Sequence, residues 1–284
     1  MKIKFKKVVI IGVGLIGGSM ARDLLTKKIA DEVVGFDADQ KNLNFAVKNK
    51  IISRAGKSLD HELKDASLVV LATPVLTIEN LLQKIADKIS AQTIVMDVGS
   101  TKKKIVELAD KLFLKGSFVG THPMAGLEKS GASASQKNLF KNSPTLIVAG
   151  KKTKTAHTKK IKALWQLLGA RVLNISINDH DRYMAACSHL PHALSFALMR
   201  SVGKKIPPAE LKKIAGNSFK SYTRISGSDA KMWVDIFIDN QKNTLARINA
   251  FQQELKSLEK LILNKDKKNL LNYMQAASQL WQKI

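Results

Sequence analysis

A histidine directly followed by a proline, His122-Pro123, lies in the segment "GTHPMAGLEKSG". Histidine has an ordinary pKa near 6.5, so it accepts a proton readily at neutral pH and commonly serves as a general base. Glu128 follows six residues later. Taken alone, these residues fit an ordinary loop better, because a His-Pro pair needs only extended backbone and histidine is often half-exposed. The rest of the chain must decide between the two interpretations.

A glycine-rich loop near the start of the sequence is typical of nucleotide binding. A β-branched run at residues 7–11 leads directly into "GVGLIGG", and a helical pattern covers residues 15–25. Gly12 permits a tight turn, Gly14 lets the backbone approach a pyrophosphate, and Gly17 lets the helix pack closely on the strand. Free N–H groups at the helix start bind the phosphates. The expected cofactor contacts in this loop are Gly12, Gly14, Leu15, Ile16 and Gly17.

Asp37 ends the next strand-like run, "EVVGFD", twenty residues after Gly17. An acidic residue at this distance from the glycine loop accepts hydrogen bonds from the ribose hydroxyls of the adenosine. Its charge would also repel the 2′-phosphate of NADP. No arginine follows closely, and Lys41 is the nearest basic residue after it. The pattern predicts that the cofactor is NAD.

Strand-like and helical segments alternate through the first half of the chain. Further apolar runs lie at residues 67–74, 93–100, 117–123, 145–150 and 170–175, and helical patterns lie at residues 78–88, 102–114 and 155–168. This alternation predicts an α/β domain, residues 1–177, with a doubly wound parallel sheet. Ligands of such sheets bind beyond the carboxyl ends of the strands. Those ends carry Thr73, Pro74, Ser100 and His122, so we expect Thr73 and Pro74 beside the cofactor and His122 near its nicotinamide.

After residue 177 the strand pattern stops, which predicts a separate helical domain over residues 178–284. The segment "NDHDRYMAACSHLPHALSFALMRSV" is typical of one long helix, capped by Asn178 or Asp179 and kinked at Pro191. His189 and His192 lie three residues apart and so share a helix face. A metal site would need a third ligand at suitable spacing, and because none accompanies them we expect no metal.

Apolar residues recur at intervals of three and four between residues 240 and 262, which predicts a long amphipathic helix. They are Leu245, Ile248, Phe251, Leu255, Leu258 and Ile262. This apolar face can pack within the subunit or across a dimer interface. A helical domain that follows a nucleotide domain cannot easily bury all its faces alone, so we favour a homodimer formed through the helical domain.

Length, charge and cysteine content narrow the class of protein. The 284 residues are about twice the usual domain length, which suggests two domains. The net charge of +24 would suit nucleic acid, but the lysines are spread along the chain without an arginine-rich stripe, so we expect no nucleic-acid partner. The single Cys187 excludes an internal disulfide and fits an inert buried thiol.

The N-terminal residues imitate a secretory signal, because a basic start precedes an apolar stretch and small residues. A strand, a glycine turn and a helix start explain more of the same segment. No apolar run reaches the roughly 20 residues of a membrane span. We therefore expect a cytoplasmic protein without a membrane partner.

Five motifs, taken in order, resemble the prephenate/arogenate dehydrogenase family of tyrosine biosynthesis. They are "GVGLIGGS", "DVGSTK", "THPMAGLEKSG", "SHLPHALSFAL" and "YTRISGSDAKMWVDI". The resemblance extends over residues 7–236 and implies a Rossmann domain followed by an all-helical dimerisation domain, with the active site in the cleft between them. It also implies the oxidative decarboxylation of prephenate by NAD to 4-hydroxyphenylpyruvate, CO2 and NADH. The alternative substrate is arogenate, which would give tyrosine directly.

The resemblance implies roles for individual residues. His122 matches the catalytic histidine that accepts the proton of the ring C4 hydroxyl as hydride leaves C4. Ser100 matches the serine that hydrogen-bonds near that hydroxyl and the nicotinamide. The residues implied to bind or border the substrate are Arg224, which holds a carboxylate, His189 and His192, and Glu128 at the pocket entrance.

Two departures from the family pattern affect turn geometry more than chemistry. Ala149-Gly150 stands where Thr-Pro is usual, and Ala230 replaces the usual proline after Ser-Asp. The nearest rival is a β-hydroxy-acid dehydrogenase, which relies on a catalytic lysine in its helical domain, and nothing in this sequence singles one out. The second rival is a basic NAD-sensing or nucleic-acid-binding module, whose nucleic-acid affinity would fall steeply with salt.

Overall fold

A computed structural model describes residues 3–113, 117–126 and 129–284. The chain forms two compact units, Met1–Asn240 and Gln241–Ile284. The first unit contains the sheet and also the helices that follow it up to residue 240. The predicted boundary after residue 177 marks the point where strands give way to helices, and it stays a prediction about the domains.

The first unit is built on an eight-stranded sheet with the order β3-β2-β1-β4-β5-β6-β7-β8. Its strands are β1 (Phe5–Ile11), β2 (Ala30–Phe36), β3 (Arg54–Ala55), β4 (Leu68–Leu71), β5 (Ile94–Asp97), β6 (Ser117–Pro123), β7 (Pro144–Val148) and β8 (Arg171–Asn174). The predicted α/β fold with a doubly wound sheet is confirmed. The short strand β3 was not predicted.

One strand pair departs from the predicted parallel arrangement, because β6 and β7 are antiparallel. The described residues between these strands form only the short 3-10 helix η1 (Ala132–Ala134). Parallel neighbours need a long crossover, usually a helix, whereas antiparallel neighbours need none. The sheet is therefore mixed, and the expectation of a purely parallel one is wrong at this pair.

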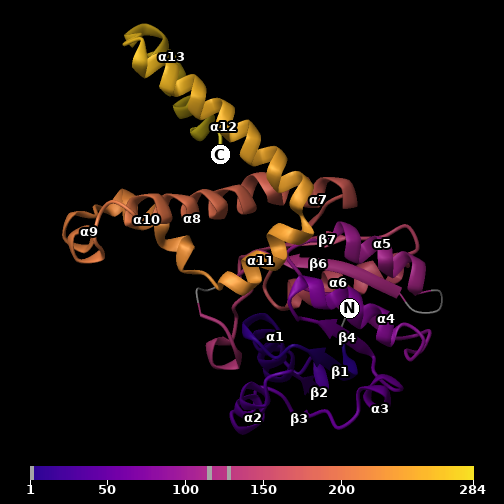
Figure 1. Ribbon diagram of the computed structural model, residues 1–284. Helices are drawn as coiled ribbons and strands as arrows, with labels where there is room; N and C mark the ends of the chain where they lie inside the picture. Colours follow the sequence, from indigo (N-terminus) through magenta and orange to yellow (C-terminus); the bar gives the residue numbers. More distant parts are fainter. Residues whose placement is uncertain (1–2, 114–116, 127–128) are drawn as a thin grey trace. The chain divides into compact units, whose positions relative to one another are not determined.

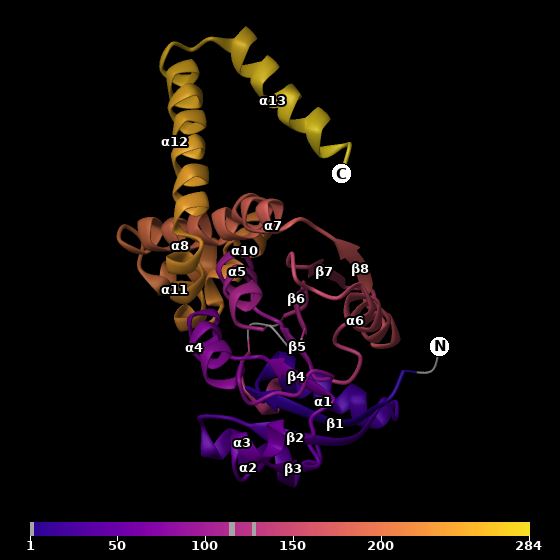
Figure 2. The same cartoon turned by 90° about the vertical axis from the view of Figure 1, so that its right-hand side faces the viewer.

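Helices cover both faces of the sheet (Figure 1 and Figure 2). Side chains of α1 (Leu15–Thr26), α2 (Gln40–Lys48) and α6 (Thr155–Leu167) join the core on one face. Those of α3 (Leu59–Leu63), α4 (Val75–Ile85) and α5 (Lys103–Leu112) join the core on the other. Successive residues of a strand point to opposite faces, so Val8 and Ile10 of β1 pack on one side while Val9 and Ile11 pack on the other.

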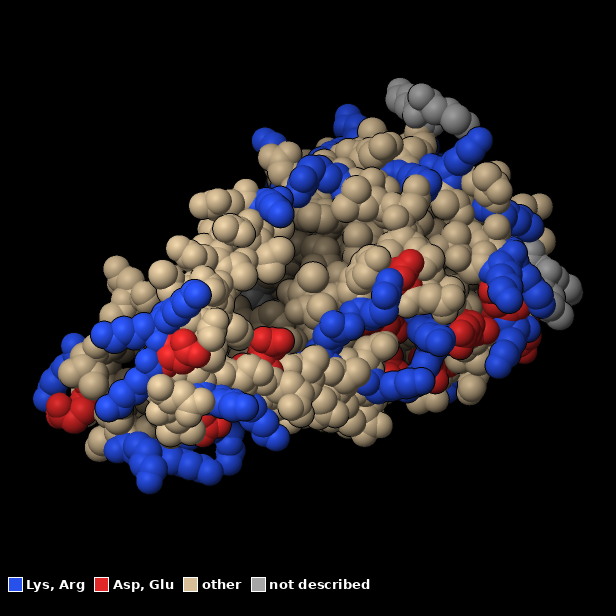
Figure 3. Space-filling model, turned by 90° about the horizontal axis from the view of Figure 1, so that it is seen from above, with Lys and Arg blue, Asp and Glu red and all other residues tan. Residues whose placement is uncertain are grey.

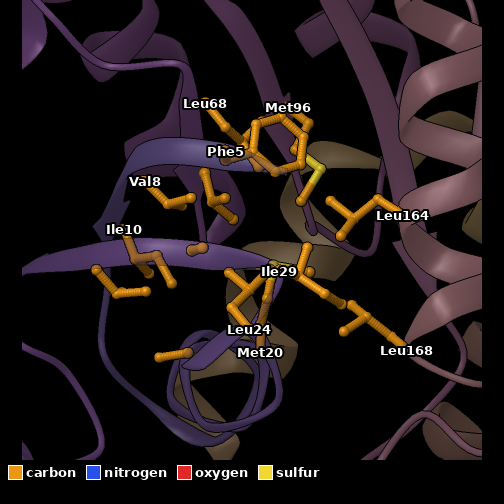
Figure 4. Close-up of a cluster of buried hydrophobic side chains, with 14 of the residues drawn as sticks. Phe5, Val8, Ile10, Met20, Leu24, Ile29, Leu68, Met96, Leu164 and Leu168 are labelled. Atoms are coloured by element: carbon orange, nitrogen blue, oxygen red, sulfur yellow. The ribbon is translucent and has the colours of Figure 1, made fainter. Parts of the chain in front are cut away.

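The first of these cores lies where α1 and α6 pack on the strands (Figure 4). Phe5 and Ile10 of β1 belong to this core together with Met20 and Leu24 of α1, and Leu164 joins it from α6. All five side chains are fully buried. This packing holds α1 against the sheet, and the glycine loop joins the end of β1 to the start of α1.

The long helix predicted after residue 177 is divided into three parts. Helix α7 (Ile177–Met184) is followed by a π-helical turn, η2 (Ala185–His189), and by α8 (Leu190–Gly203). Pro191 has no backbone N–H to continue the α-helical ladder, which accounts for the wider turn before it. The predicted cap is wrong by two or three positions, because the Ser176 hydroxyl accepts from the Asp179 backbone N–H.

The remaining helices of the first unit are α9 (Pro208–Ile214), α10 (Asn217–Thr223), the 3-10 turn η3 (Arg224–Gly227) and α11 (Ala230–Asp239). The second unit consists of α12 (Gln241–Leu263) and α13 (Lys267–Trp281). The predicted amphipathic helix is confirmed as α12, whereas α13 was not predicted.

Three features of the described residues concern charge, membrane spans and the single thiol. Lys and Arg side chains are scattered over the face shown in Figure 3, with Asp and Glu among them. In the part of the chain that the structure describes, no helix has the length and apolar content needed to cross a membrane.

Cys187 is exposed, so the expectation of a buried thiol is wrong, since Ala185 and His189 take the buried positions of the π-helical turn.

Candidate active site

A cavity of about 500 Å3 opens at the carboxyl ends of the central strands. The glycine loop, the residues after β4 and β5, and the end of β6 form one side of it, and residues of η2, α8 and α11 form the other. The predicted site residues that line the cavity are Gly14, Leu15, Ile16, Thr73, Pro74, Ser100, His122 and His192. Residues far apart in the sequence thus meet at the place where the fold predicts a ligand.

Backbone geometry determines the glycine-loop end of the cavity. Gly12 has a φ of +97°, and a Cβ there would lie 2.4 Å from the Ala72 carbonyl oxygen. A Cβ on Gly17 would lie 2.0 Å from the Gly12 carbonyl oxygen. Both positions therefore require glycine for steric reasons. Gly14 differs, since a Cβ there meets no described atom within 4 Å, which leaves its cavity side open for a ligand.

The groups around this loop fit a dinucleotide. Gly14 is the N-cap of α1 and has no side chain that could accept a hydrogen bond from the helix. The first backbone N–H groups of α1 therefore remain available to a ligand in the cavity. Thr73 lines the cavity, and its hydroxyl oxygen is buried and has no hydrogen-bond partner among the described residues. A buried polar atom of this kind is well placed to bond to a polar ligand.

Asp37 lies behind the glycine loop and does not line the cavity. One of its carboxylate oxygens accepts from the Val13 backbone N–H at 2.9 Å and from the Asn42 amide at 2.7 Å. The other accepts from the Asp39 backbone N–H at 2.9 Å. A carboxylate has about four acceptor positions, so Asp37 braces the loop and retains capacity for a ribose hydroxyl. No motif in the sequence indicates this bracing.

A buried ion pair supports the loop that carries Ser100. Lys102 and Asp97 form this pair, and both side chains are fully buried. The Asp97 carboxylate also accepts from the Gly99 backbone N–H at 2.9 Å. These contacts stabilise the turn from β5 into α5. Ser100, in this turn, is half-buried and lies at the cavity surface. This pair is not apparent from the sequence, because a Lys–Asp pair five residues apart is common on protein surfaces.

His122 lies on β6, opposite Leu146 of β7, and is only 8% exposed. Its Nδ1 atom lies 2.9 Å from Nε2 of His180 on α7. Burial lowers the pKa of His122 well below its usual value, and the nearby His180, Lys102 and His189 lower it further. His122 is therefore neutral at pH 7, which is the state that a proton acceptor needs.

Two further residues extend this contact away from the cavity. The His180 Nδ1 atom lies 2.7 Å from an Asp181 carboxylate oxygen. Asp181 in turn accepts from the Lys102 backbone N–H at 2.8 Å and from the Lys103 backbone N–H at 3.0 Å. The sequence shows "HD" in "NDHDRY", but nothing in it links that pair to a histidine 58 positions earlier.

The two histidines predicted from "SHLPH" lie in different surroundings. His192 lines the cavity and stacks on Trp233, with ring centroids 3.7 Å apart, and its Nδ1 donates to the Ser188 carbonyl oxygen at 2.9 Å. His189 is 1% exposed, and its Nδ1 lies 3.1 Å from the Asn240 amide. Burial lowers the pKa of His189 to about 4. His189 thus supports the wall from behind, whereas His192 forms it.

The remaining predicted substrate-binding residues lie elsewhere. Arg224 is exposed and lines a neighbouring surface hollow together with Lys220 and Thr223. Burial is the main cause of the lowered pKa of His192, and the charge of Arg224 adds to it, so the guanidinium lies near the cavity wall. Glu128 lies outside the described residues. The roles of both stay predictions.

The site brings a candidate proton acceptor together with a glycine loop. A neutral buried histidine lies at one side of the cavity, glycine-loop backbone at another, and an aromatic wall of Trp233 closes it. Within the described ranges, no cluster of three or more His, Cys, Asp or Glu could hold a metal ion. The arrangement suits hydride transfer from a carbon whose hydroxyl proton passes to His122.

Comparisons with known proteins agree on one family. "Prephenate dehydrogenase, nucleotide-binding domain" matches residues 20–174, and "Prephenate dehydrogenase, dimerization domain" matches residues 176–276. The prephenate dehydrogenase of Bacillus subtilis is 31% identical over 95% of this chain and 74% of its own length.

Solved structures of the same kind align with nearly the whole chain. The Aquifex aeolicus prephenate dehydrogenase, in complex with hydroxyphenyl propionate and NAD+, superposes with a TM-score of 0.91 at 32% identity, covering 100% of this chain and 99% of that one. Synechocystis arogenate dehydrogenase gives a TM-score of 0.82 at 28% identity, covering 98% and 99%.

Proposed function

The chain belongs to the prephenate dehydrogenase family of NAD-dependent oxidoreductases, and we propose that it converts prephenate to 4-hydroxyphenylpyruvate and CO2 in tyrosine biosynthesis. The observation that carries this proposal is His122, a neutral buried histidine that lines the same cavity as the glycine loop. The proposal includes a cytoplasmic location, because the reaction draws on the cellular pool of NAD.

The proposed chemistry needs one proton acceptor from the chain. His122 accepts the proton of the ring C4 hydroxyl while the hydrogen on C4 leaves as hydride. NAD, when bound, supplies the hydride acceptor. The bond from the ring to its carboxylate then breaks, CO2 departs, and the electron pair makes the ring aromatic. His122 returns its proton to the phenolate oxygen, so the histidine ends as it began.

Aromatisation drives the loss of CO2, so the residues around the ring need only orient it and exclude water. Ser100 lies at the cavity surface and is proposed to hydrogen-bond near the C4 hydroxyl. His192, stacked on Trp233, borders the ring, and Arg224 near that wall is proposed to hold a carboxylate. The substrate is a dianion, which the net charge of +24 attracts over longer distances.

Arogenate is the second candidate substrate, because the chain is also 28% identical to an arogenate dehydrogenase of known structure. The two substrates share the ring and differ only in the side chain, which carries a keto group in prephenate and an amino group with its charge in arogenate. His122 and the glycine loop serve both equally. The choice depends on the groups that face the side chain.

The test offers prephenate and arogenate separately to the purified full-length protein with NAD, and NADH absorbance gives the rate. We expect kcat/KM to be higher with prephenate, with 4-hydroxyphenylpyruvate as the product. A His122→Asn preparation purified in parallel measures contaminating activity. Preference for arogenate would support the second candidate, and no NADH with either substrate would contradict the proposed function.

The assembly proposed for this enzyme is a homodimer formed through its helical domain. Apolar side chains on α12 and α13 are about half or more exposed in the single chain. They include Leu245, Leu255, Ile262, Leu271, Met274 and Trp281. A patch of this kind on a soluble enzyme marks an interaction site. Light scattering at micromolar concentration should give the mass of a dimer, and Leu255→Lys should weaken it, whereas a monomer mass for the unchanged protein would contradict the proposal.

A further inference from the structure

A continuous chain of hydrogen bonds runs from the cavity to the start of α5. It begins at His122, passes through His180 to Asp181, and ends on the backbone N–H groups of Lys102 and Lys103. Each distance lies between 2.7 and 3.0 Å. His180 is fully buried and His122 and Asp181 are nearly so. Because the bonds are directional, the protonation of one member determines that of the next.

Asp181, at the acidic end of this series of hydrogen bonds, determines which atom donates in each bond. Burial raises the pKa of Asp181, but its bonds from His180 and from the backbone N–H groups outweigh that effect and leave the pKa lowered. Asp181 is therefore ionised at neutral pH, and a carboxylate can only accept. The Nδ1 atom of His180, 2.7 Å away, must carry the hydrogen of that bond.

The donor and acceptor atoms of the two imidazole rings follow from this assignment. Burial lowers the pKa of His180, so its ring is neutral and carries a single hydrogen. With that hydrogen on Nδ1, the Nε2 atom of His180 can only accept. The Nδ1 atom of His122 must then donate across the 2.9 Å contact. The one remaining nitrogen of His122, Nε2, keeps a free electron pair on the residue that lines the cavity.

We propose that His180, held by Asp181, is a positioning residue that fixes His122 in the tautomer with hydrogen on Nδ1 and thereby presents Nε2 as the proton acceptor. The use of this acceptor in oxidation rests on the proposed function, whereas the tautomer itself does not. The bracing by α5 fixes the orientation of the pair as well. Asn240 adds a second anchor, because its amide donates to the Asp181 carbonyl oxygen at 2.7 Å.

The same contacts serve the state that follows proton transfer. Once Nε2 of His122 has taken the substrate proton, the ring is positively charged and its Nδ1–H still donates to His180. The Asp181 carboxylate behind His180 then offsets that charge at short range. The other titratable groups near this pair are Lys102 at the start of α5, Asp97 on β5 and His189 on η2.

Nitrogen-15 NMR of the histidine rings tests the tautomer directly in the full-length protein. The chain has only six histidines, so single substitutions assign their signals. We expect His122 and His180 both to carry hydrogen on Nδ1 at pH 7.5. Finding His122 with hydrogen on Nε2 would overturn the proposal, whether or not the enzyme is active.

Two substitutions at His180 test the effect on turnover. His180→Phe keeps an aromatic ring but removes the acceptor, and we expect kcat to fall about 10²-fold with KM changed less than about twofold. His180→Gln retains an acceptor oxygen that can reach His122 Nδ1, and we expect it to recover most of that loss. His157→Gln on α6 is the matched control and should change neither kcat nor the His122 tautomer.

The outcomes separate this proposal from the proposed function and from a merely structural role. If the protein without substitutions is inactive with both substrates, the proposed function is contradicted. The NMR result then still decides the tautomer. Equal loss in His180→Phe and His180→Gln, in proportion to their melting temperatures, would overturn the positioning role. If His180→Phe does not fold, the NMR spectrum of the unchanged protein and the kinetics of His180→Gln decide.

Discussion

The glycine-loop end of the cavity is built from backbone, whereas the histidine end is built from side chains of several elements. At the first end, Gly12 and Gly17 bring main-chain atoms so close that no Cβ fits between them. At the second, His122 from β6 depends on His180 from α7 and, through Asp181, on the start of α5. The first end therefore depends on steric space, and the second depends on protonation state.

Substitutions at the two ends of the cavity should therefore have different effects. A change at the backbone end acts through contact distances, so it alters cofactor binding or the fold at every pH. A change at the histidine end acts through a proton, so it alters turnover and its pH dependence while the fold and the binding of ligands stay nearly the same. Substitutions at the two ends should thus give separable kinetic signatures.

The largest effect is expected at His122. His122→Asn keeps a polar side chain of similar size but removes the base, and kcat should fall by roughly 10²- to 10⁴-fold. The KM values for NAD and prephenate should change far less, because the side chain acts mainly in the transition state. Steady-state kinetics measure both. Near-normal turnover would show that the histidine end is only structural.

The pH profile sharpens the same comparison. Burial, with the nearby charges, lowers the pKa of His122, so the neutral form persists below the usual value of 6.5. The rate of the unchanged enzyme should hold constant as the pH falls through 6.5 and should decline only at lower pH. That acidic limb should be absent in His122→Asn. A limb centred at or above 6.5 would argue against the buried environment of this histidine.

The next effect is expected at the backbone end, where two glycines give a matched pair. Gly14→Ala places a methyl group where no described atom lies within 4 Å, so the fold should persist while the KM for NAD rises about tenfold or more. Gly17→Ala forces a Cβ to 2.0 Å from the Gly12 carbonyl oxygen, so the melting temperature should fall as well. Kinetics and thermal melting distinguish the two. Equal destabilisation by both would contradict the assigned difference.

Arg224 should give a smaller change that belongs to neither end. Arg224→Ala should raise the KM for prephenate by about tenfold, in line with the loss of one charge-assisted hydrogen bond, and should leave kcat within about threefold. Arg200→Ala on α8, an exposed arginine that does not line either hollow, is the matched control. An unchanged KM for Arg224→Ala would place the carboxylate-binding cation elsewhere.

The smallest effect is expected at Asp37, which braces the glycine loop from behind. Asp37→Ser removes the charge that would repel a 2′-phosphate, so the ratio of kcat/KM for NADP to that for NAD should rise several-fold, by about 1 kcal/mol. Ser retains one acceptor for the Val13 backbone N–H. Equal use of both cofactors by the unchanged enzyme would contradict the expected preference for NAD.

Much of the first unit was predictable because its signals are local. The glycine loop, the strand before it and the helix after it occupy one continuous stretch, and the alternation of strands and helices reveals the doubly wound sheet. The antiparallel pair β6–β7 was missed because the direction of a strand depends on the connection before it. The π-helical turn before Pro191 was expected only as a kink.

The candidate site was predictable residue by residue but not as an arrangement. One cavity brings together the glycine loop, Thr73, Ser100, His122 and His192. This agrees with the rule that ligands bind beyond the carboxyl ends of the strands. His189 faces away from that cavity toward Asn240, although it lies three residues from His192. Both rings lie near Trp233, but only His192 reaches the cavity while His189 is buried behind it, and sequence spacing alone does not report that difference in depth.

The sequence by itself determined the family, the α/β architecture and the types of residue available for chemistry, because motifs and periodicity are properties of short segments. Only the tertiary structure decided how those residues act together. In the proposed mechanism, His122 becomes a base with a defined tautomer through a histidine 58 residues away and a carboxylate bound to α5. Such contacts join elements that are distant in the chain, and only the packing of α7 against the sheet brings them within hydrogen-bond distance.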